Sequence, residues 1–486
     1  MRILIILILI ISPVAFGQIN FFEEYSGIGN DFGQGVVQLP DSSYVITGAS
    51  SSFSGAQTDA FLLCIDSTGA YKWSTFFGGE ESDWGRRVIY VENDGYYVAG
   101  YSNSNVGNGF DYYLTKTDVY GIAQWYKYYG GQDWEKVNDA ALTRDTGVIM
   151  VGEVETMSEG KNGWIVRTDK DGDTLWTKTI GTTGEDFITC IDQWNDSVFV
   201  AGGQVYIEDS LMNKGLLYCF KDDGTELWRD TVGPDGNYFF NDIVIRLDTI
   251  QGVGAARIDE NDDWDAWRVS YLLNTQTMFY DINEHNDGEV IGKGLAIYNW
   301  DDTRYMGFSR KDQFSYPDGR DLFFAHQNIY MFTMLSNAGN VARDGEDELG
   351  EMISTSDGGM MAVGYTSFRN GVNGNWVYAF KIGPDNSIPY QDQVGNVLQL
   401  VGQKELNLKA GIRVFPNPVT NELNIKTEQF PILNGKVYNL TGSVVADFQV
   451  EKSSSVQVEQ LNSGVYILEL TEPESGAVYT EKIVKD

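Results

Sequence analysis

The sequence predicts an all-β protein: a seven-bladed β-propeller followed by a small immunoglobulin-like β-sandwich. Three observations support this fold class. A unit of about 50 residues recurs seven times along the chain. Short apolar segments alternate with turn residues in every unit. The repeat stops near residue 383, and a second group of short strand-like segments follows. The 486 residues suffice for one large repeat domain and one small domain.

Each unit contains an acidic residue, an apolar strand, a hairpin turn and a second strand ending in glycine, as in residues 83–100. A third strand, a turn containing Asp and Gly, and a fourth strand carrying Trp then follow. Because a four-stranded blade cannot cover its own faces, we expect the units to pack side by side in a ring. The seven marker glycines are Gly48, Gly100, Gly152, Gly202, Gly254, Gly307 and Gly364.

The two ends of the repeat region predict how the ring closes. The seventh unit has a third strand at residues 376–381 but no convincing fourth strand. Residues 19–27 resemble an isolated fourth strand, with Phe22 in the place that Trp73 holds in the next unit. We therefore expect this N-terminal segment to complete the last blade. Units five and six are the weakest copies of the repeat.

The N-terminus has the pattern of a secretory signal peptide. A positive start precedes an apolar run at residues 3–11, and small residues end at Gly17. We expect residues 1–17 to be removed, with no transmembrane segment in the mature protein. The propeller is then expected over 18–383 and a linker over 384–411.

Two motifs of the repeat are the Gly78-Gly79-x-x-x-Asp83 opening and the Asp118-x-x-Gly121-x-x-x-Trp125 turn. With these motifs the units resemble the bacterial β-propeller repeats of the SBBP type. The resemblance covers residues 19–383. It implies the propeller architecture and says little about activity, because such propellers carry unrelated functions.

Residues 412–486 contain about seven short alternating strands, which fits an immunoglobulin-like sandwich. The segment contains a set of motif residues: Phe415, Pro416, Asn417, Pro418, Gly442, Gly464, Lys482 and Lys485. With these residues it resembles the type A C-terminal sorting domain of type IX secretion in Bacteroidetes. The resemblance implies export across both membranes, contact with the type IX machinery, and removal of the domain with surface attachment or release.

The charge balance argues against several classes of partner and chemistry. With 34 basic and 69 acidic residues, the chain has a net charge of −35, which disfavours nucleic acid and anionic lipid as ligands. The three cysteines do not form a disulfide framework. The two histidines, His285 and His326, have neither zinc spacing nor a nucleophile elbow nearby. No catalytic residue is predicted.

An acidic set recurs seventeen residues before the marker glycines, and five of its seven positions are carboxylates. These side chains would bind calcium, which prefers oxygen ligands, or a sugar. Alternatively, each acid accepts backbone hydrogen bonds at a blade junction, and repetition around the ring favours this interpretation. The positions are Asp31, Asp83, Glu135, Glu185, Asn237, Val290 and Asp347.

Aromatic residues near these acids are candidate glycan contacts. Trp84 and Trp134 lie next to the acidic set, and Asp263 and Trp264 belong to the densest acidic-aromatic loop. The alternative for that loop is a solvated segment with a buried tryptophan. Residues 169–173, which resemble part of a calcium loop, are better explained as a turn.

Three functions remain open. The first is an exported cell-surface or extracellular propeller that binds a glycan or an extracellular protein. The second is a secreted glycan-active hydrolase with two close carboxylates that are not part of the sevenfold set. The third is a structural surface protein without a discrete ligand. No cofactor is expected, and calcium is the one candidate cation.

Overall fold

The computed structural model describes residues 20–485, with gaps at 28, 53–56, 106–108, 157–159, 260–261, 284–287, 298–302, 313–320, 329–333, 342–346, 370–371, 384–396, 400–402, 405–411, 416–417, 428–431, 440–443 and 472–477. The predicted signal peptide and the sorting-motif residues Pro416, Asn417 and Gly442 therefore lie outside the described residues.

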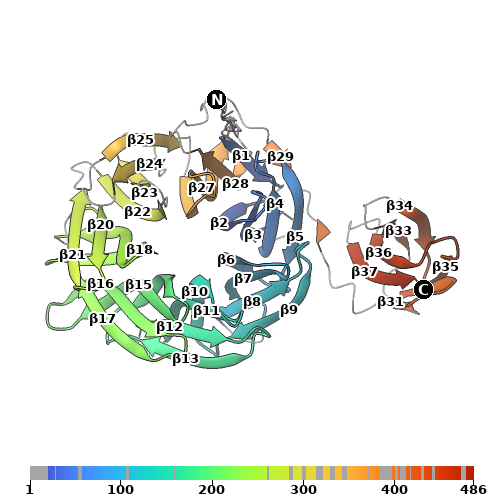
Figure 1. The fold of residues 1–486 in the computed structure, drawn as a ribbon, viewed down its shortest axis with the longest axis horizontal. Helices are drawn as coiled ribbons and strands as arrows, with labels where there is room; N and C mark the ends of the chain where they lie inside the picture. Colours follow the sequence, from blue (N-terminus) through green and yellow to red (C-terminus); the bar gives the residue numbers. More distant parts are fainter. Residues whose placement is uncertain are drawn as a thin grey trace, which may run out of the picture.

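Seven antiparallel sheets are arranged around a central channel, which confirms the seven-bladed propeller (Figure 1). In each blade the first strand lies closest to the channel and the fourth lies at the outer rim. The strands of the first four blades are β2 (Asp31–Gln38), β3 (Tyr44–Ser50), β4 (Asp59–Ile65), β5 (Tyr71–Phe77), β6 (Asp83–Val91), β7 (Gly95–Ser102), β8 (Asp111–Thr117), β9 (Ala123–Tyr129), β10 (Trp134–Leu142), β11 (Val148–Thr156), β12 (Gly160–Thr168), β13 (Thr174–Ile180), β14 (Phe187–Asn195), β15 (Val198–Ile207), β16 (Met212–Lys221) and β17 (Glu226–Val232).

Units five and six, the weakest copies in the sequence, are also complete four-stranded sheets. The strands of the last three blades are β18 (Asn237–Arg246), β19 (Thr249–Arg257), β20 (Asp265–Leu272), β21 (Thr277–Asn283), β22 (Gly288–Ile297), β23 (Thr303–Asp312), β24 (Asp321–Asn328), β25 (Met334–Val341), β26 (Asp347–Ser354), β27 (Met360–Arg369) and β28 (Val372–Ile382).

The core consists of apolar layers between neighbouring blades. Between the second and third blades, for example, Tyr97 and Leu114 pack with Val137, Met150 and Val166, all buried. Because both faces of each middle strand are covered, these strands are apolar over nearly their whole length. Burial of such side chains contributes about 1.5–3 kcal/mol each.

The ring closes through the N-terminal strand β1 (Phe21–Ser26), which pairs antiparallel with β28 and supplies the fourth strand of the last blade. The position equivalent to Trp73 belongs to Phe21, which lies opposite Lys381, and the expectation of Phe22 was wrong by one residue. Phe21 also packs on Gly69 of the next blade.

The fourth-strand aromatic residues pack on the glycines of the Asp-x-x-Gly turns in the following blade. Trp73 approaches Gly121, Trp125 approaches Gly172 and Trp176 approaches Gly224. These glycines have φ angles of 78°, 78° and 81°, a left-handed backbone that a side chain rarely adopts. The Trp of the motif in one blade and the Gly of the motif in the following blade therefore form one inter-blade contact.

Part of the predicted linker adds edge strands to the two blades that meet at the ring closure. β29 (Val397–Gln399) pairs parallel with β1, and β30 (Gln403–Lys404) pairs parallel with β5. Both extend their blades to five strands.

The C-terminal domain is the expected sandwich of seven strands in two sheets. Its core contains the buried residues Leu423, Val437, Leu468 and Ile483. The described part of the chain contains no helix able to span a membrane. The strands are β31 (Ile412–Phe415), β32 (Glu422–Thr427), β33 (Leu433–Asn439), β34 (Val444–Val450), β35 (Ser453–Gln457), β36 (Gly464–Thr471) and β37 (Val478–Lys485).

Candidate ligand site at the mouth of the channel

Every channel-lining strand contains a β-bulge at the same position, so one extra residue per blade turns toward the channel. These seven bulged residues line a cavity of about 330 Å³ that we call the channel mouth. They are Gln34, Arg86, Asn138, Thr189, Asn241, Lys293 and Gly350.

Bulged side chains also join neighbouring blades. The Asn138 amide donates to the carbonyl oxygen of Ile188 at 2.8 Å, and the Asn241 amide donates to that of Gly292 at 2.7 Å. Thr189 makes the equivalent bond to Phe240 O at 2.7 Å. The bulged residues therefore give the channel mouth a polar lining and also form hydrogen bonds between neighbouring blades.

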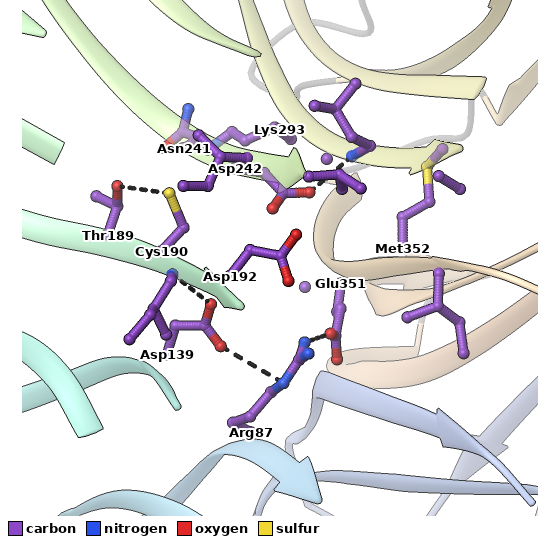
Figure 2. A pocket seen from close by; sticks show the side chains of 18 of the residues that line it. Arg87, Asp139, Thr189, Cys190, Asp192, Asn241, Asp242, Lys293, Glu351 and Met352 are labelled. Carbon is purple, nitrogen blue, oxygen red and sulfur yellow. Dashed lines mark hydrogen bonds and ion pairs between the residues drawn. The ribbon is translucent and has the colours of Figure 1, made fainter. Parts of the chain in front are cut away.

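The residue after each bulge forms a second, deeper ring, which is mainly anionic. Asp139, Asp242 and Glu351 point into it, and Arg87 forms ion pairs with Glu351 and Asp139, the latter at 3.4 Å (Figure 2). The three acids, Asp139, Asp242 and Glu351, each accept an equivalent hydrogen bond from a backbone N–H group of the following blade. The acceptor–donor pairs are Asp139 with Ile191 N (3.0 Å), Asp242 with Leu295 N (2.8 Å) and Glu351 with Val36 N (2.6 Å).

Burial disfavours the ionised form of two carboxylates here. One is Asp242 of the deep ring, and the other is Asp192, two residues beyond the deep-ring position Cys190 of the fourth blade. Burial raises the pKa of Asp242 to about 8, and the charges of Asp139 and Asp192 add to the rise. Burial likewise raises the pKa of Asp192 to about 6, although hydrogen bonds from Ile245 N and Gln193 N oppose it. Figure 2 shows both carboxylates directed into the same space. The deep ring therefore holds protonated acid near neutral pH.

The acids predicted from the repeat lie at the blade junctions instead of in the channel. Asp31 accepts a hydrogen bond from Gly27 N at 2.7 Å, and Asp83 accepts one from Gly79 N at 2.8 Å. Burial raises the pKa of both carboxyls, while these bonds lower it. Burial, with the charges of Asp111 and Asp133, raises the pKa of Glu135 to about 7. Asp347 is fully buried.

Two positions of the acidic set were wrong. In the fourth blade Gly203, not Gly202, pairs with Ile188, the residue before the bulge. The acid seventeen residues earlier is therefore Asp186, and Glu185 is exposed. Asp186 accepts hydrogen bonds from Thr182 N and, at 2.6 Å, from Tyr206 N. In the fifth blade the hairpin is one residue shorter, and buried Tyr238 replaces the expected Asn237. Val290 lies in the expected place.

The residue that follows each junction acid lies beside the channel mouth, and four of the seven are aromatic: Phe32, Trp84, Phe187 and Phe239. Phe32 and Trp84 belong to a chain of contacting rings that crosses four blades, from Tyr365 to Trp134. We call it the aromatic arc. Its ring-centroid distances are Tyr365–Phe32 5.0 Å, Phe32–Trp84 5.1 Å, Trp84–Tyr101 6.0 Å, Tyr101–Phe110 5.3 Å and Phe110–Trp134 5.4 Å.

Lys136 covers the far end of the aromatic arc. Its Nζ lies 5.3 Å from the Trp134 ring centroid, 5.6 Å from that of Phe110 and 5.9 Å from that of Tyr101. A shorter cluster lies across the ring, where Phe239 contacts Trp264 at 5.1 Å. Trp264 is half-buried beneath Arg257, and Asp263 is exposed.

The sequence singled out Trp84 and Trp134 but missed the rest of this site. An aromatic residue directly after the junction acid recurs in blades one, two and four, and this signal is visible once the fourth blade is aligned on Asp186. The bulged residues have no common type, so their shared position shows only in the strand pairing.

Among the described residues, no group of three His, Cys, Asp or Glu side chains is placed to hold a metal ion. Asp169 uses its Oδ1 to accept hydrogen bonds from the backbone N–H groups of Asp171 and Asp173, which fits the turn interpretation. The side chains of His285 and His326 lie outside the described part of the molecule.

Residues 413–486 match the family model of the secretion system C-terminal sorting domain. The C-terminal domain is a secretion system sorting domain. This match confirms the predicted sorting domain and indicates secretion to the cell surface or beyond it.

Within the sorting domain, the described motif residues are spread over three strands. Phe415 ends β31 and is half in solvent, with Lys426 Nζ 5.6 Å from its ring centroid. Pro418 is exposed, and Gly464 at the start of β36 pairs with Lys485 of β37. Lys482 pairs with Ile467 in the same sheet.

Several solved structures are similar to this chain at low identity. The β-propeller domain of the trilobed protease of Pyrococcus furiosus is 9% identical, with 79% of this chain and 100% of that domain covered and a TM-score of 0.40. PorZ, a surface component of the type IX secretion system of Porphyromonas gingivalis, is 10% identical, with 96% and 100% covered and a TM-score of 0.19.

The acylaminoacyl peptidase of Pyrococcus horikoshii is 10% identical with a TM-score of 0.39; the match covers 84% of this chain and only 58% of the peptidase. No curated protein matches the sequence. Because these TM-scores are below 0.5, the propeller assignment rests on the seven sheets themselves.

Proposed function

We propose that this protein is exported through the type IX secretion system and acts at the cell surface or outside the cell as a ligand-binding propeller. The sorting domain supports export by this secretion system. The observation that carries the binding role is the aromatic arc, which lies beside the polar channel mouth on one face of the ring.

The aromatic arc has the composition of a recognition surface. Trp134 is 45% exposed, and Trp84, Phe32, Tyr101 and Phe110 are each half-buried. Contiguous exposed rings of this kind usually mark a binding surface. The links between blades and the loops between second and third strands meet on this face, and such loops commonly carry ligand sites.

A glycan fits this surface well, because flat rings accept the apolar face of a sugar while polar side chains of the channel mouth bind its hydroxyls. The alternative ligand is an extracellular protein, for which exposed tryptophan and tyrosine are also typical contacts. Neither needs the buried junction acids, whose backbone hydrogen bonds support a structural role.

The test is a glycan array probed with residues 18–486, comparing the natural sequence with Trp84→Ala and Trp134→Ala. We expect binding that both substitutions weaken by at least tenfold. The matched control is Tyr120→Ala, because Tyr120 is 69% exposed in a turn on the opposite face. Glycan binding that only Tyr120→Ala removes, or no binding to any glycan, would argue against this glycan-binding surface.

A second candidate is a glycan hydrolase, favoured by two carboxylates, Asp192 and Asp242, that line the same pocket in the channel. Asp192 and Asp242 do not belong to the sevenfold junction set, and Asp242 has the raised pKa that a general acid requires. We would measure release of reducing ends from each bound glycan. Activity lost in both Asp192→Asn and Asp242→Asn would support hydrolysis, and unchanged glycan over a day would oppose it.

A further inference from the structure

The bulged residues of the channel mouth differ in the sign of their charge from the whole chain. In a protein of net charge −35, these seven residues include two cations, Arg86 and Lys293, and no acid, although Glu348 also lines the cavity. Lys136, at the far end of the aromatic arc, is a third cation on this face. The carboxylates of the deep ring lie one residue further into the channel.

Arg86 is the cation best placed to meet a ligand. Its Nη1 donates to the Gln34 side chain, its Nε is buried without a hydrogen-bond partner, and no carboxylate among the described residues forms an ion pair with it. Lys293, in contrast, lies 3.5 Å from Glu348. Arg86 as a whole is half-buried, and it is its Nε that is shielded from solvent. A shielded N–H donor without an acceptor costs free energy, which a ligand acceptor would recover.

Arg86 also lies next to the aromatic arc. It lines the same cavity as Tyr365, the ring at one end of the arc. In keeping with this position, burial raises the pKa of Tyr101 and the positive charge of Arg86 opposes that rise. One ligand could therefore touch both an aromatic face and Arg86. The channel mouth itself, with about 330 Å³, has room for one sugar unit.

We propose that the ligand is an acidic saccharide, a glycan containing uronic acid, whose carboxylate binds Arg86 while neighbouring sugar rings lie on the aromatic arc. Guanidinium donors match the two oxygens of a carboxylate, and this pairing is stronger than a neutral hydrogen bond. The local cations are needed because the remaining surface repels an anionic polymer. This inference rests on the proposed function.

The experiment compares acidic oligosaccharides with their neutral methyl esters, which differ only in the charge of the carboxyl group. Residues 18–486 are titrated calorimetrically with hexasaccharides of galacturonate, alginate and hyaluronan, and with each ester. We expect at least one acid to bind at least tenfold more tightly than its ester. Arg86→Gln should remove this preference, so that acid and ester bind with the same affinity, and Arg86→Lys should restore only part of it.

The matched control is Arg144→Gln, which removes the same charge from a 79%-exposed side chain in the first hairpin of the third blade, on the opposite face. Circular dichroism and thermal melting confirm that each variant is folded. Equal binding of acid and ester, or an unchanged preference in Arg86→Gln, overturns the proposal.

Failure of this inference is distinguishable from failure of the proposed function. If a neutral glycan binds and Trp134→Ala removes it while Arg86→Gln has no effect, the binding face stands and the acidic ligand is excluded. If no acidic or neutral saccharide binds, both proposals for a glycan fall, and a protein partner becomes the remaining ligand.

Discussion

Asp186 and Glu185 are adjacent in the sequence but have opposite environments. Asp186 is 1% exposed and accepts hydrogen bonds from two backbone N–H groups, whereas Glu185 is exposed. We expect Asp186→Ala to lower the free energy of unfolding by about 2–5 kcal/mol, because both donors lose their acceptor. Glu185→Ala should change it by less than about 0.5 kcal/mol. Urea denaturation of both variants measures the difference; similar losses would contradict the revised alignment of the fourth blade.

Asp242 should make the propeller less stable as pH rises. Its pKa is about 8 in the folded protein and near 3.8 in the unfolded chain, so the folded state binds the extra proton between these values. The free energy of unfolding must then fall as pH rises from 4 to 8. We expect Asp242→Asn to reduce this fall by on the order of 2 kcal/mol.

Thermal melting between pH 5 and 8.5 tests the prediction. Asp192→Asn is the matched control, because its pKa of about 6 confines its effect to the acidic part of that range. A melting temperature of Asp242→Asn that falls with pH as steeply as that of the natural protein would exclude a buried protonated Asp242.

At the scale of the strand, the shared β-bulge is the element on which the site depends. In the seventh blade the bulged residue is Gly350, and a Cβ there would lie 2.5 Å from the carbonyl oxygen of Gly33 in the first blade. We expect Gly350→Ala to destabilise the protein by about 1–3 kcal/mol through this clash. Gly131→Ala is the control, since a Cβ at Gly131 meets nothing within 4 Å. Equal stability of both variants would show that Gly350 and Gly33 are further apart than they are in this structure.

The sequence predicts the strands and turns well because they depend on local patterns. Alternating polarity, the Asp-x-x-Gly turns and the fourth-strand tryptophans recur with nearly constant spacing. The bulge has no such signature: one extra residue changes the pairing but leaves the apolar pattern intact. Adjacent Gly202 and Gly203 then make two alignments of the fourth blade look equally good, which is why the acid there was misplaced.

At the scale of the whole molecule, the ring closes by pairing residues from both ends of the propeller. The sequence predicted this closure from a missing strand at one end and an extra strand at the other. It could not predict β29 and β30, because edge pairing of short polar segments depends on which edge lies nearby and not on their own composition. Nor could spacing alone reveal that the aromatic arc spans four blades.

The closing strand β1 should be essential for the stability of the ring. It buries Phe21 and Tyr25 and pairs with five consecutive residues of β28. Loss of the two side chains alone removes roughly 3–6 kcal/mol, which is comparable with the total stability of many proteins. We expect a chain starting at residue 28 to unfold at much lower urea concentration than residues 18–486, whereas deletion of 397–404 should have a small effect.

Because β1 binds only as an added strand, its loss should be reversible. A peptide of residues 18–27 can restore the missing edge through the same backbone hydrogen bonds. We expect it to raise the melting temperature of the shortened chain in a concentration-dependent way. The same peptide with Phe21→Ala should act weakly, because the contact with Gly69 of the first blade is lost. Equal rescue by both peptides would show that Phe21 does not link the last blade to the first.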